Sequence, residues 1–165
     1  MISLKEMKIV DKVVKYLESK ENGNWHPDKT RKSNLHGKGA DIVMVGGSKN
    51  GERFIIECKG KYESKSSKST NHEGWLNALG QIITRMNVKK YTIKKGSSKI
   101  SSINRAYKYG LGLYWKTARV ALRRIPKPIA QVLNLYIFSV SDKGIVKQFT
   151  PSQFGKEEYL DSLFK

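Results

Sequence analysis

The feature that most constrains this fold is a pair of short apolar runs on either side of a polar, glycine-rich turn. The first run, the turn and the second run cover residues 39–45, 46–51 and 54–59. Two runs joined by a turn of this composition predict a β-hairpin. With the turn centred near Lys49, Asp41 lies directly opposite Glu57. Because side chains alternate along a strand, Glu57 and Lys59 then share a face with Asp41.

The predicted hairpin brings two carboxylates and an ammonium group together at one end. Carboxylates that face each other on a sheet destabilise it unless a cation lies between them. Mg²⁺ or Mn²⁺ suits this position, since both ions prefer carboxylate oxygens and also bind phosphate oxygens. Lys59 beside such an ion could orient or deprotonate a water molecule. The spacing leaves open the alternative that Asp41 and Glu57 only mark strand ends and that Lys59 is solvated.

The evidence for a functional site comes from the context of Glu57, and not from the string Glu-x-Lys itself. The string begins at four positions, namely Glu6, Glu18, Glu57 and Glu63. Only Glu57 lies near the end of an apolar strand and faces an aspartate, Asp41, of a preceding strand. This combination resembles the core of the PD-(D/E)xK nuclease superfamily, which includes restriction endonucleases and archaeal Holliday-junction resolvases. The family usually has a proline before the aspartate, where this chain has Ala40, but a proline there would ligate nothing.

The resemblance extends over residues 3–140 and implies an α/β fold with a restriction endonuclease-like core, a central mixed β-sheet flanked by helices. It also implies a Mg²⁺-dependent (or Mn²⁺-dependent) endonuclease that hydrolyses phosphodiester bonds in DNA, with junction resolution among the activities of the family. Asp41, Glu57 and the backbone carbonyl of Cys58 would hold the metal. Lys59 would position or activate the attacking water.

Apolar residues at helical spacing predict an amphipathic first helix over residues 3–20. In resolvase-type members of the family, a glutamate in the first turn of this helix reaches the metal site. Glu6 matches that position and would be catalytic and a metal ligand, while Glu18 on the opposite flank is the other candidate. Alternatively, Glu6 only completes a capping box with Ser3 as the N-cap.

A second helix is predicted over residues 73–88 from an apolar stripe. The stripe consists of Trp75, Leu76, Leu79, Ile82, Ile83 and Met86. Gln81 and Arg85 lie one turn apart on a neighbouring flank and could contact the same ligand. Family members often present a polar residue, frequently glutamine, from this helix, so the resemblance implies a catalytic contact for Gln81. Arg85 either binds nucleic acid or is a surface charge.

The remainder of the chain predicts further strands and helices within a single domain of residues 1–165. Strands are expected over 105–114, 130–140 and 145–149, and helices over 115–125 and 152–164. Residues 88–104 give a weaker indication of one further short strand. Gly110 and Gly112 predict bends in the first of these strands. Pro126 and Pro128 predict the end of the helix before them. The aromatic segment Tyr107–Trp115 fits either a dimer interface or the core.

The formal net charge of +18 points to a polyanionic partner. No acidic residue lies between Glu73 and Asp142, although many lysines and arginines do. Nucleic acid, most plausibly double-stranded or branched DNA, is the leading candidate. An anionic membrane surface and a merely solubilising charge are the weaker alternatives. The residues expected to contact nucleic acid are Lys38, Lys61, Arg85, Lys116, Arg119 and Arg123.

Three functions therefore remain open at the level of the sequence. The first is the nuclease, directed at DNA or at RNA. The second is a basic nucleic-acid-binding protein without catalysis, and the third is a basic protein that binds another protein or an anionic lipid. The chain has no apolar run long enough to span a membrane and no signal-peptide pattern, which predicts a cytoplasmic, nucleoid-associated protein. Its one cysteine, Cys58, excludes an intramolecular disulfide and is expected to be a buried apolar residue.

Overall fold

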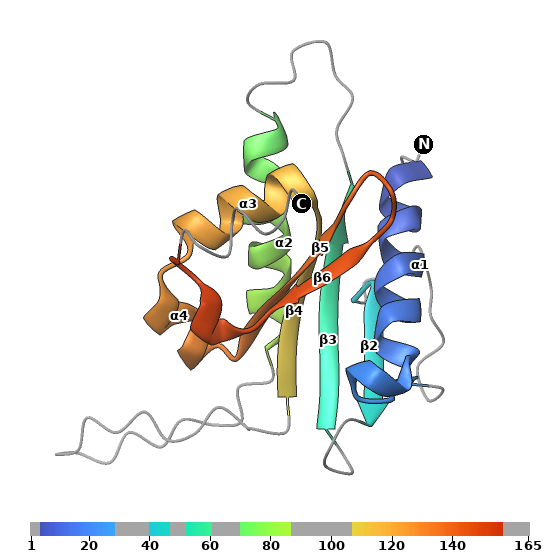
Figure 1. Cartoon of the computed structure of the whole chain (residues 1–165). Helices are drawn as coiled ribbons and strands as arrows, with labels where there is room; N and C mark the ends of the chain where they lie inside the picture. Colours follow the sequence, from blue (N-terminus) through green and yellow to red (C-terminus); the bar gives the residue numbers. More distant parts are fainter. Residues whose placement is uncertain (1–3, 29–39, 47–51, 61–69, 87–106, 157–165) are drawn as a thin grey trace, which may run out of the picture.

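A six-stranded mixed β-sheet forms the centre of the molecule in the computed structural model, which describes residues 4–28, 40–46, 52–60, 70–86 and 107–156 (Figure 1). The strands lie side by side in chain order, from β1 to β6. They are β1 (His26–Pro27), β2 (Ile42–Gly46), β3 (Glu52–Lys59), β4 (Tyr107–Tyr114), β5 (Leu135–Val140) and β6 (Val146–Phe149). The general α/β class expected from the sequence is confirmed.

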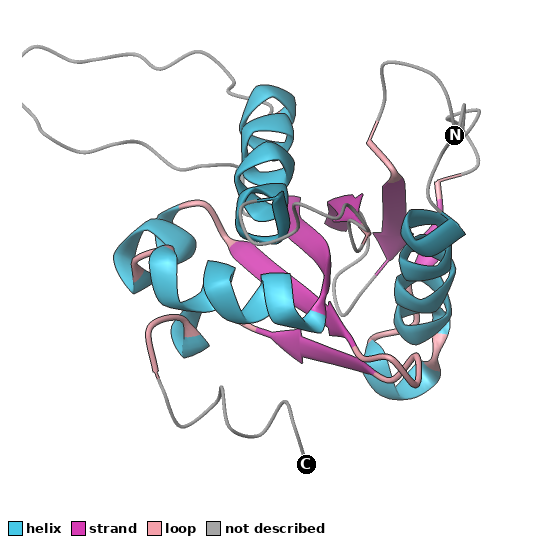
Figure 2. Cartoon of the chain, turned by 90° about the horizontal axis from the view of Figure 1, so that it is seen from above, coloured by secondary structure: helices cyan, strands magenta, loops and turns pink. Residues whose placement is uncertain are grey.

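Helices cover both faces of this sheet. They are α1 (Leu4–Glu18), α2 (Thr70–Arg85), α3 (Trp115–Arg124) and α4 (Lys127–Val132), with short 3₁₀ turns η1 (Lys20–Asn22) and η2 (Pro151–Gln153). Seen from above, α1 lies on one side of the strands, and α2 and α3 lie on the other (Figure 2). Among the described segments, no helix is both long enough and apolar enough to cross a bilayer.

The predicted hairpin is present in the predicted register. β2 and β3 are antiparallel, with Ile42 paired with Ile56. Continuing this register by one residue places Asp41 opposite Glu57. β4 and β5 run parallel to β3, so Lys59, Tyr114 and the residues after Val140 all lie at one edge of the sheet. This edge is the carboxyl end of three parallel strands, where α/β proteins commonly bind ligands.

The face under α1 is packed closely enough to require glycine in β4. Ile9 and Val13 of α1 are buried against β3 and β4, in a cluster that includes Cys58. A Cβ at Gly112 would lie 2.6 Å from the sulfur of Cys58. The predicted bends at the β4 glycines are therefore wrong, because β4 is one continuous strand paired on both sides and its glycines make room for neighbours.

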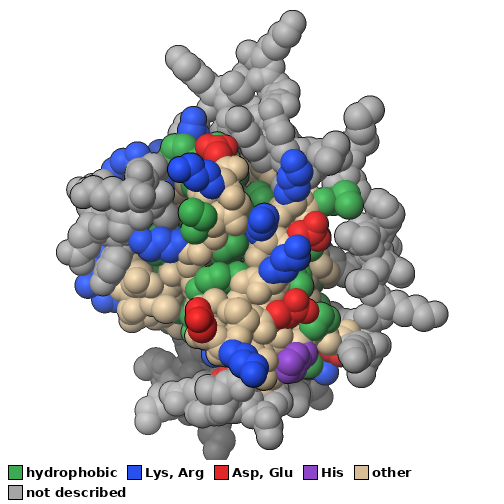
Figure 3. Space-filling view, turned by 45° about the vertical axis from the view of Figure 1, so that its right-hand side comes forward, with side chains coloured by type: hydrophobic (Ala, Val, Ile, Leu, Met, Phe, Trp, Pro, Cys, Tyr) green, Lys and Arg blue, Asp and Glu red, His purple; other side chains and the backbone are tan. Residues whose placement is uncertain are grey.

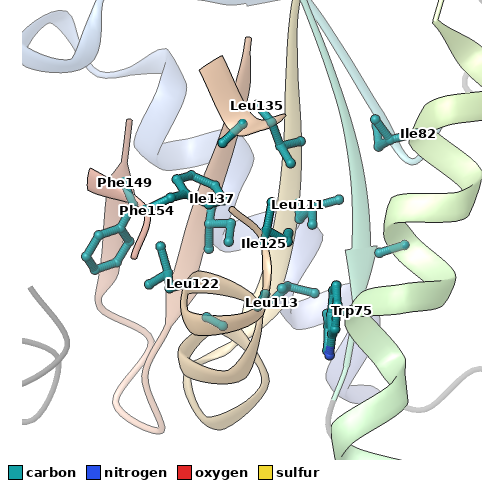
Figure 4. Packing of buried hydrophobic residues seen from close by; sticks show 14 of the residues in the cluster. Trp75, Ile82, Leu111, Leu113, Leu122, Ile125, Leu135, Ile137, Phe149 and Phe154 are labelled. Carbon is teal, nitrogen blue, oxygen red and sulfur yellow. The ribbon is translucent and has the colours of Figure 1, made fainter. Parts of the chain in front are cut away.

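The opposite face holds a second core beneath α2, α3 and α4. Trp75 and Ile82 point from α2 toward Leu111 and Leu113 of β4 (Figure 4). β4 lies between two strands and most of its side chains are buried. Most of the segment from Tyr107 to Tyr114 is therefore part of the core.

Element boundaries differ from the sequence predictions at several places, and α2 covers Thr70–Arg85 where a helix over 73–88 was predicted. The strand expected from residue 130 begins at Leu135, because residues 127–132 form α4. Pro126 caps this helix and Pro128 lies in its first turn, where proline fits a helix well. The closing helix expected over 152–164 is wrong at its start, since residues 151–153 form η2. Residues 157–164 and the hinted strand within 88–104 lie outside the described residues.

Candidate functional site

Asp41 lies at the sheet edge with its carboxylate held by the backbone of β3. Its Oδ2 accepts a hydrogen bond from the backbone N–H of Cys58 at 2.7 Å. The side chain thus extends the hairpin pairing beyond Ile42, the first residue of β2. This bond fixes a carboxylate oxygen beside the main chain that joins Glu57 to Lys59, as the hairpin register predicted.

Glu57 is the most deeply buried carboxylate of this region. Its side chain is 1% exposed and forms an ion pair with Arg85 in the last turn of α2. A buried carboxylate without a counter-charge would cost several kcal/mol, about 3–5 in typical cases. Burial lowers the pKa of the Arg85 guanidinium from its ordinary value, and the nearby charge of Asp41 opposes that shift. Arg85 therefore lies close to both Glu57 and Asp41.

Lys59 faces a third carboxylate, from the opposite layer of the structure. Its Nζ lies 3.3 Å from Oε1 of Glu6 in the first turn of α1. Both side chains are partly buried. Glu18 is exposed at the far end of the same helix, so the structure brings Glu6 and not Glu18 to this edge. Ser3, the proposed N-cap, lies outside the described residues.

The Cys58 thiol lies among these charges. It is fully buried, and its pKa is raised well above the ordinary value, first by burial and then by the charges of Asp41 and Glu6. The positive charge of Lys59 lowers it in part. We call the following five residues at this edge the carboxylate cluster: Glu6, Asp41, Glu57, Lys59 and Arg85. It contains three carboxylates and two cations, so one negative charge is in excess.

The donor chemistry of the carboxylate cluster fits a hard divalent cation. Asp41, Glu57 and Glu6 offer carboxylate oxygens, which Mg²⁺ and Mn²⁺ prefer, and the excess charge is negative. Within the part of the chain that the structure describes, no three Asp, Glu, His or Cys side chains converge as a ready set of ligands. Two of the three carboxylates are instead paired with Lys59 and Arg85. A metal would exchange with these internal cations.

Gln81 and Lys59 line the same groove. The groove has a volume of about 460 Å³. Its lining consists of Lys59, Leu76, Asn77, Gly80, Gln81 and Thr84. Leu76 and Ile83 were expected in the buried stripe of α2, but each is 50% exposed. The apolar pattern alone could not reveal this, because the buried stripe of α2 is narrower than its apolar stripe.

The predicted phosphate-binding residues fall into three groups. Lys116 and Arg123 are exposed on α3 and Arg119 is partly buried there, while Lys38 and Lys61 lie outside the described residues. Neither α3 nor α4 carries an acidic residue. On the face that includes α1, by contrast, acidic and basic side chains are interspersed (Figure 3). Arg85, the sixth, pairs with Glu57, a contact that the sequence reasoning did not anticipate.

A second polar cluster at the same sheet edge was also missed. Asp142, just after β5, accepts hydrogen bonds from the Tyr114 hydroxyl at 2.8 Å and from the Trp115 indole N–H at 3.0 Å. Burial, followed by the hydrogen bond and charge of Asp142, raises the pKa of Tyr114 to about 12. We call these three residues the Asp142 cluster. In the sequence, the only indication of this cluster is an aspartate that follows a predicted strand.

The chain was compared with known proteins in three ways. No protein-family model, no curated protein and no solved structure matches it. Inferences about function therefore rest on the residues and geometry described above.

Proposed function

We propose that the protein is a metal-dependent nuclease of the restriction endonuclease-like type that hydrolyses phosphodiester bonds in DNA. The observation that carries the proposal is the convergence of Asp41, Glu57 and Lys59 at one end of the hairpin, with Glu6 reaching them from α1. Asp41 is exposed and Glu57 is buried. Bringing these groups together is costly for stability alone, since like charges repel and the desolvated charge of Glu57 is unfavourable.

Four side chains of the carboxylate cluster have a catalytic role in this proposal. Asp41, Glu57 and Glu6 would hold Mg²⁺ or Mn²⁺, together with the carbonyl of Cys58. The bound metal would polarise a phosphate oxygen and lower the pKa of a water molecule. Lys59 carries three N–H donors and can orient the attacking water or stabilise negative charge on the phosphate. The N–H of Cys58 keeps Asp41 oriented throughout.

The charge distribution supports nucleic acid as the substrate. The chain carries a net charge of +18, and α3 and α4 together present basic side chains without an acidic one. Contacts of this kind to phosphates give affinity that falls steeply with salt, without sequence readout. Double-stranded or branched DNA is the proposed substrate, and RNA is the alternative within the same chemistry.

A second function has one specific observation in its favour. Glu57 is already paired with Arg85, and Glu6 with Lys59, so most of the cluster is compensated within the protein. A nucleic-acid-binding protein without catalysis would need no more than this. The two proposals differ in whether a divalent metal supports hydrolysis.

The deciding experiment is a cleavage assay on labelled linear duplex, single strand, flap, four-way junction and structured RNA, with Mg²⁺, Mn²⁺ or EDTA. Asp41→Asn removes the charge and keeps an oxygen for the Cys58 N–H, so the fold should persist. We expect cleavage to fall roughly 10³-fold, since a metal contributes several kcal/mol to the transition state. Asp11→Asn, an exposed position on α1, is the matched control and should cleave normally.

The same assay separates the alternatives. Cleavage of the structured RNA alone would show that RNA, and not DNA, is the substrate. Salt-sensitive binding without cleavage under any metal would favour the non-catalytic protein. No binding of any nucleic acid would leave a partner of another class, a protein or an anionic lipid.

A further inference from the structure

The groove between Lys59 and α2 has features that neither the core nor the carboxylate cluster explains. Asn77, Gln81 and Thr84 follow one side of α2 at helical spacing, and Gly80 lies between them. Lys59 forms the wall that the groove shares with the carboxylate cluster. A ligand in the groove would therefore lead directly to the candidate catalytic groups.

Gly80 is the least expected residue of the groove. It lies in the interior of a long helix, is exposed, and a Cβ added to it would meet nothing within 4 Å. The fold therefore does not need glycine here, although glycine in a helix interior is less stable than alanine. What glycine does provide is a bare stretch of helix backbone that another backbone can approach closely.

The chemistry of the lining selects the kind of backbone. Lys59 supplies an ammonium group, and Asn77 and Gln81 supply amide N–H donors, whereas none of the described lining residues carries a carboxylate. Thr84 donates its hydroxyl hydrogen to the carbonyl of Gln81 at 2.8 Å, so it offers only an acceptor. Half-exposed Leu76 adds an apolar contact. Donors for an anion beside an apolar surface match the alternating phosphates and sugars of a nucleic-acid strand.

We infer that this groove seats the sugar-phosphate backbone of one nucleic-acid strand, with Gly80 as the point of closest approach. The inference rests on the proposed function and adds to it the path of the strand beside the catalytic groups. Contacts to the backbone are independent of base sequence, so the groove contributes position and affinity and does not select a sequence. An amphipathic helix of a protein partner is the competing occupant, and it predicts normal nucleic-acid binding by the Gly80 variants below.

The test is binding of a labelled 20-nucleotide strand and its duplex in EDTA, where no cleavage occurs. Gly80→Leu places a branched side chain in the groove and should weaken binding by at least about tenfold, the equivalent of 1.4 kcal/mol. Gly80→Ala should raise Tm by about 2–4 °C, because it stabilises the helix, and yet should weaken binding. These opposite effects separate a contact from a folding defect. Ile83→Gln, exposed on the same helix but outside the groove, should bind normally.

Each outcome decides the inference. Weaker binding by both Gly80 variants, with Ile83→Gln unchanged, supports it. Normal binding by Gly80→Leu, or equal weakening by Ile83→Gln, overturns it even if the cleavage assay establishes a nuclease. Conversely, loss of binding by Gly80→Leu in a protein that never cleaves would overturn the nuclease and retain the strand path. If the unaltered protein binds no nucleic acid, both proposals fall.

Discussion

Two polar clusters lie at the same edge of the sheet, and they compensate charge in different ways. The carboxylate cluster holds three acidic side chains against two cations, drawn from α1, the β2–β3 hairpin and α2. The Asp142 cluster holds one carboxylate against two neutral donors, Tyr114 and Trp115. The first retains an excess negative charge that a metal could meet, whereas both oxygens of Asp142 are already hydrogen-bonded. The two clusters share the carboxyl end of the parallel strands, and the proposed catalytic role belongs to the carboxylate cluster alone.

The largest expected difference between the two clusters is in catalysis. Glu57→Gln keeps the shape of the side chain and removes its charge, so cleavage should fall roughly 10³-fold as a metal ligand is lost. Asp142→Asn should leave the cleavage rate within about twofold, because both oxygens of Asp142 already accept hydrogen bonds from Tyr114 and Trp115. Single-turnover cleavage with saturating metal measures both. A large loss of cleavage in Asp142→Asn at an unchanged Tm would contradict the proposed difference between the two clusters.

The next difference concerns stability within the carboxylate cluster. Arg85→Met leaves Glu57 buried without its counter-charge, and the free energy of unfolding should fall by about 2–3 kcal/mol. This is below the range for fully buried pairs because the guanidinium is 23% exposed. The double variant Glu57→Gln/Arg85→Met should recover much of the loss, since the unpaired charge is gone.

Urea unfolding of the single and double variants measures this coupling. Additive losses would show that Arg85 does not compensate Glu57. Arg124→Met, at an exposed position in the last turn of α3, is the matched control and should change stability by less than about 0.5 kcal/mol.

The smallest expected effect belongs to the Asp142 cluster. Tyr114→Phe removes one hydrogen bond to a carboxylate and should destabilise the fold by about 1 kcal/mol without changing cleavage. The pKa of Tyr114 is raised to about 12 in the folded protein, above the value of about 10 expected when unfolded. Its contribution to stability is thus complete below pH 10 and is lost as the pH rises toward 12.

Urea unfolding at pH 8, 10 and 11 tests the sign of this dependence. Other tyrosines and lysines also titrate in that range, so the informative quantity is the difference between the unaltered protein and Tyr114→Phe. That difference should shrink with rising pH. A constant difference would contradict the hydrogen-bonded, protonated state of Tyr114.

The carboxylate cluster was predictable to the extent that local patterns determine it. The turn length and the alternation of β2 and β3 were enough to place Asp41 opposite Glu57. The resemblance to the nuclease superfamily, and not the helical spacing, singled out Glu6, which lies beside Lys59. The pairing of Glu57 with Arg85 was not predictable. It depends on the rotation of α2 over the sheet, which Trp75 sets by packing against long-range partners.

The same reasoning accounts for what was missed elsewhere. α4 was overlooked because Pro126 and Pro128 also fit the end of a helix, and only the packing of buried Ala130 favours a new one. The bond from Tyr114 to Asp142 joins residues 28 positions apart. Sequence periodicity contains no information about contacts of that range.

The close packing of Cys58 has a practical consequence. Its sulfur lies beneath α1 and so near Gly112 that not even a Cβ fits between them, and the raised pKa leaves little thiolate. A thiol reagent can therefore reach it only when α1 separates from the sheet. As the single cysteine of the chain, it gives a labelling rate that reports the opening of this one layer. The labelling rate of Cys58 therefore measures how often α1 separates from the sheet.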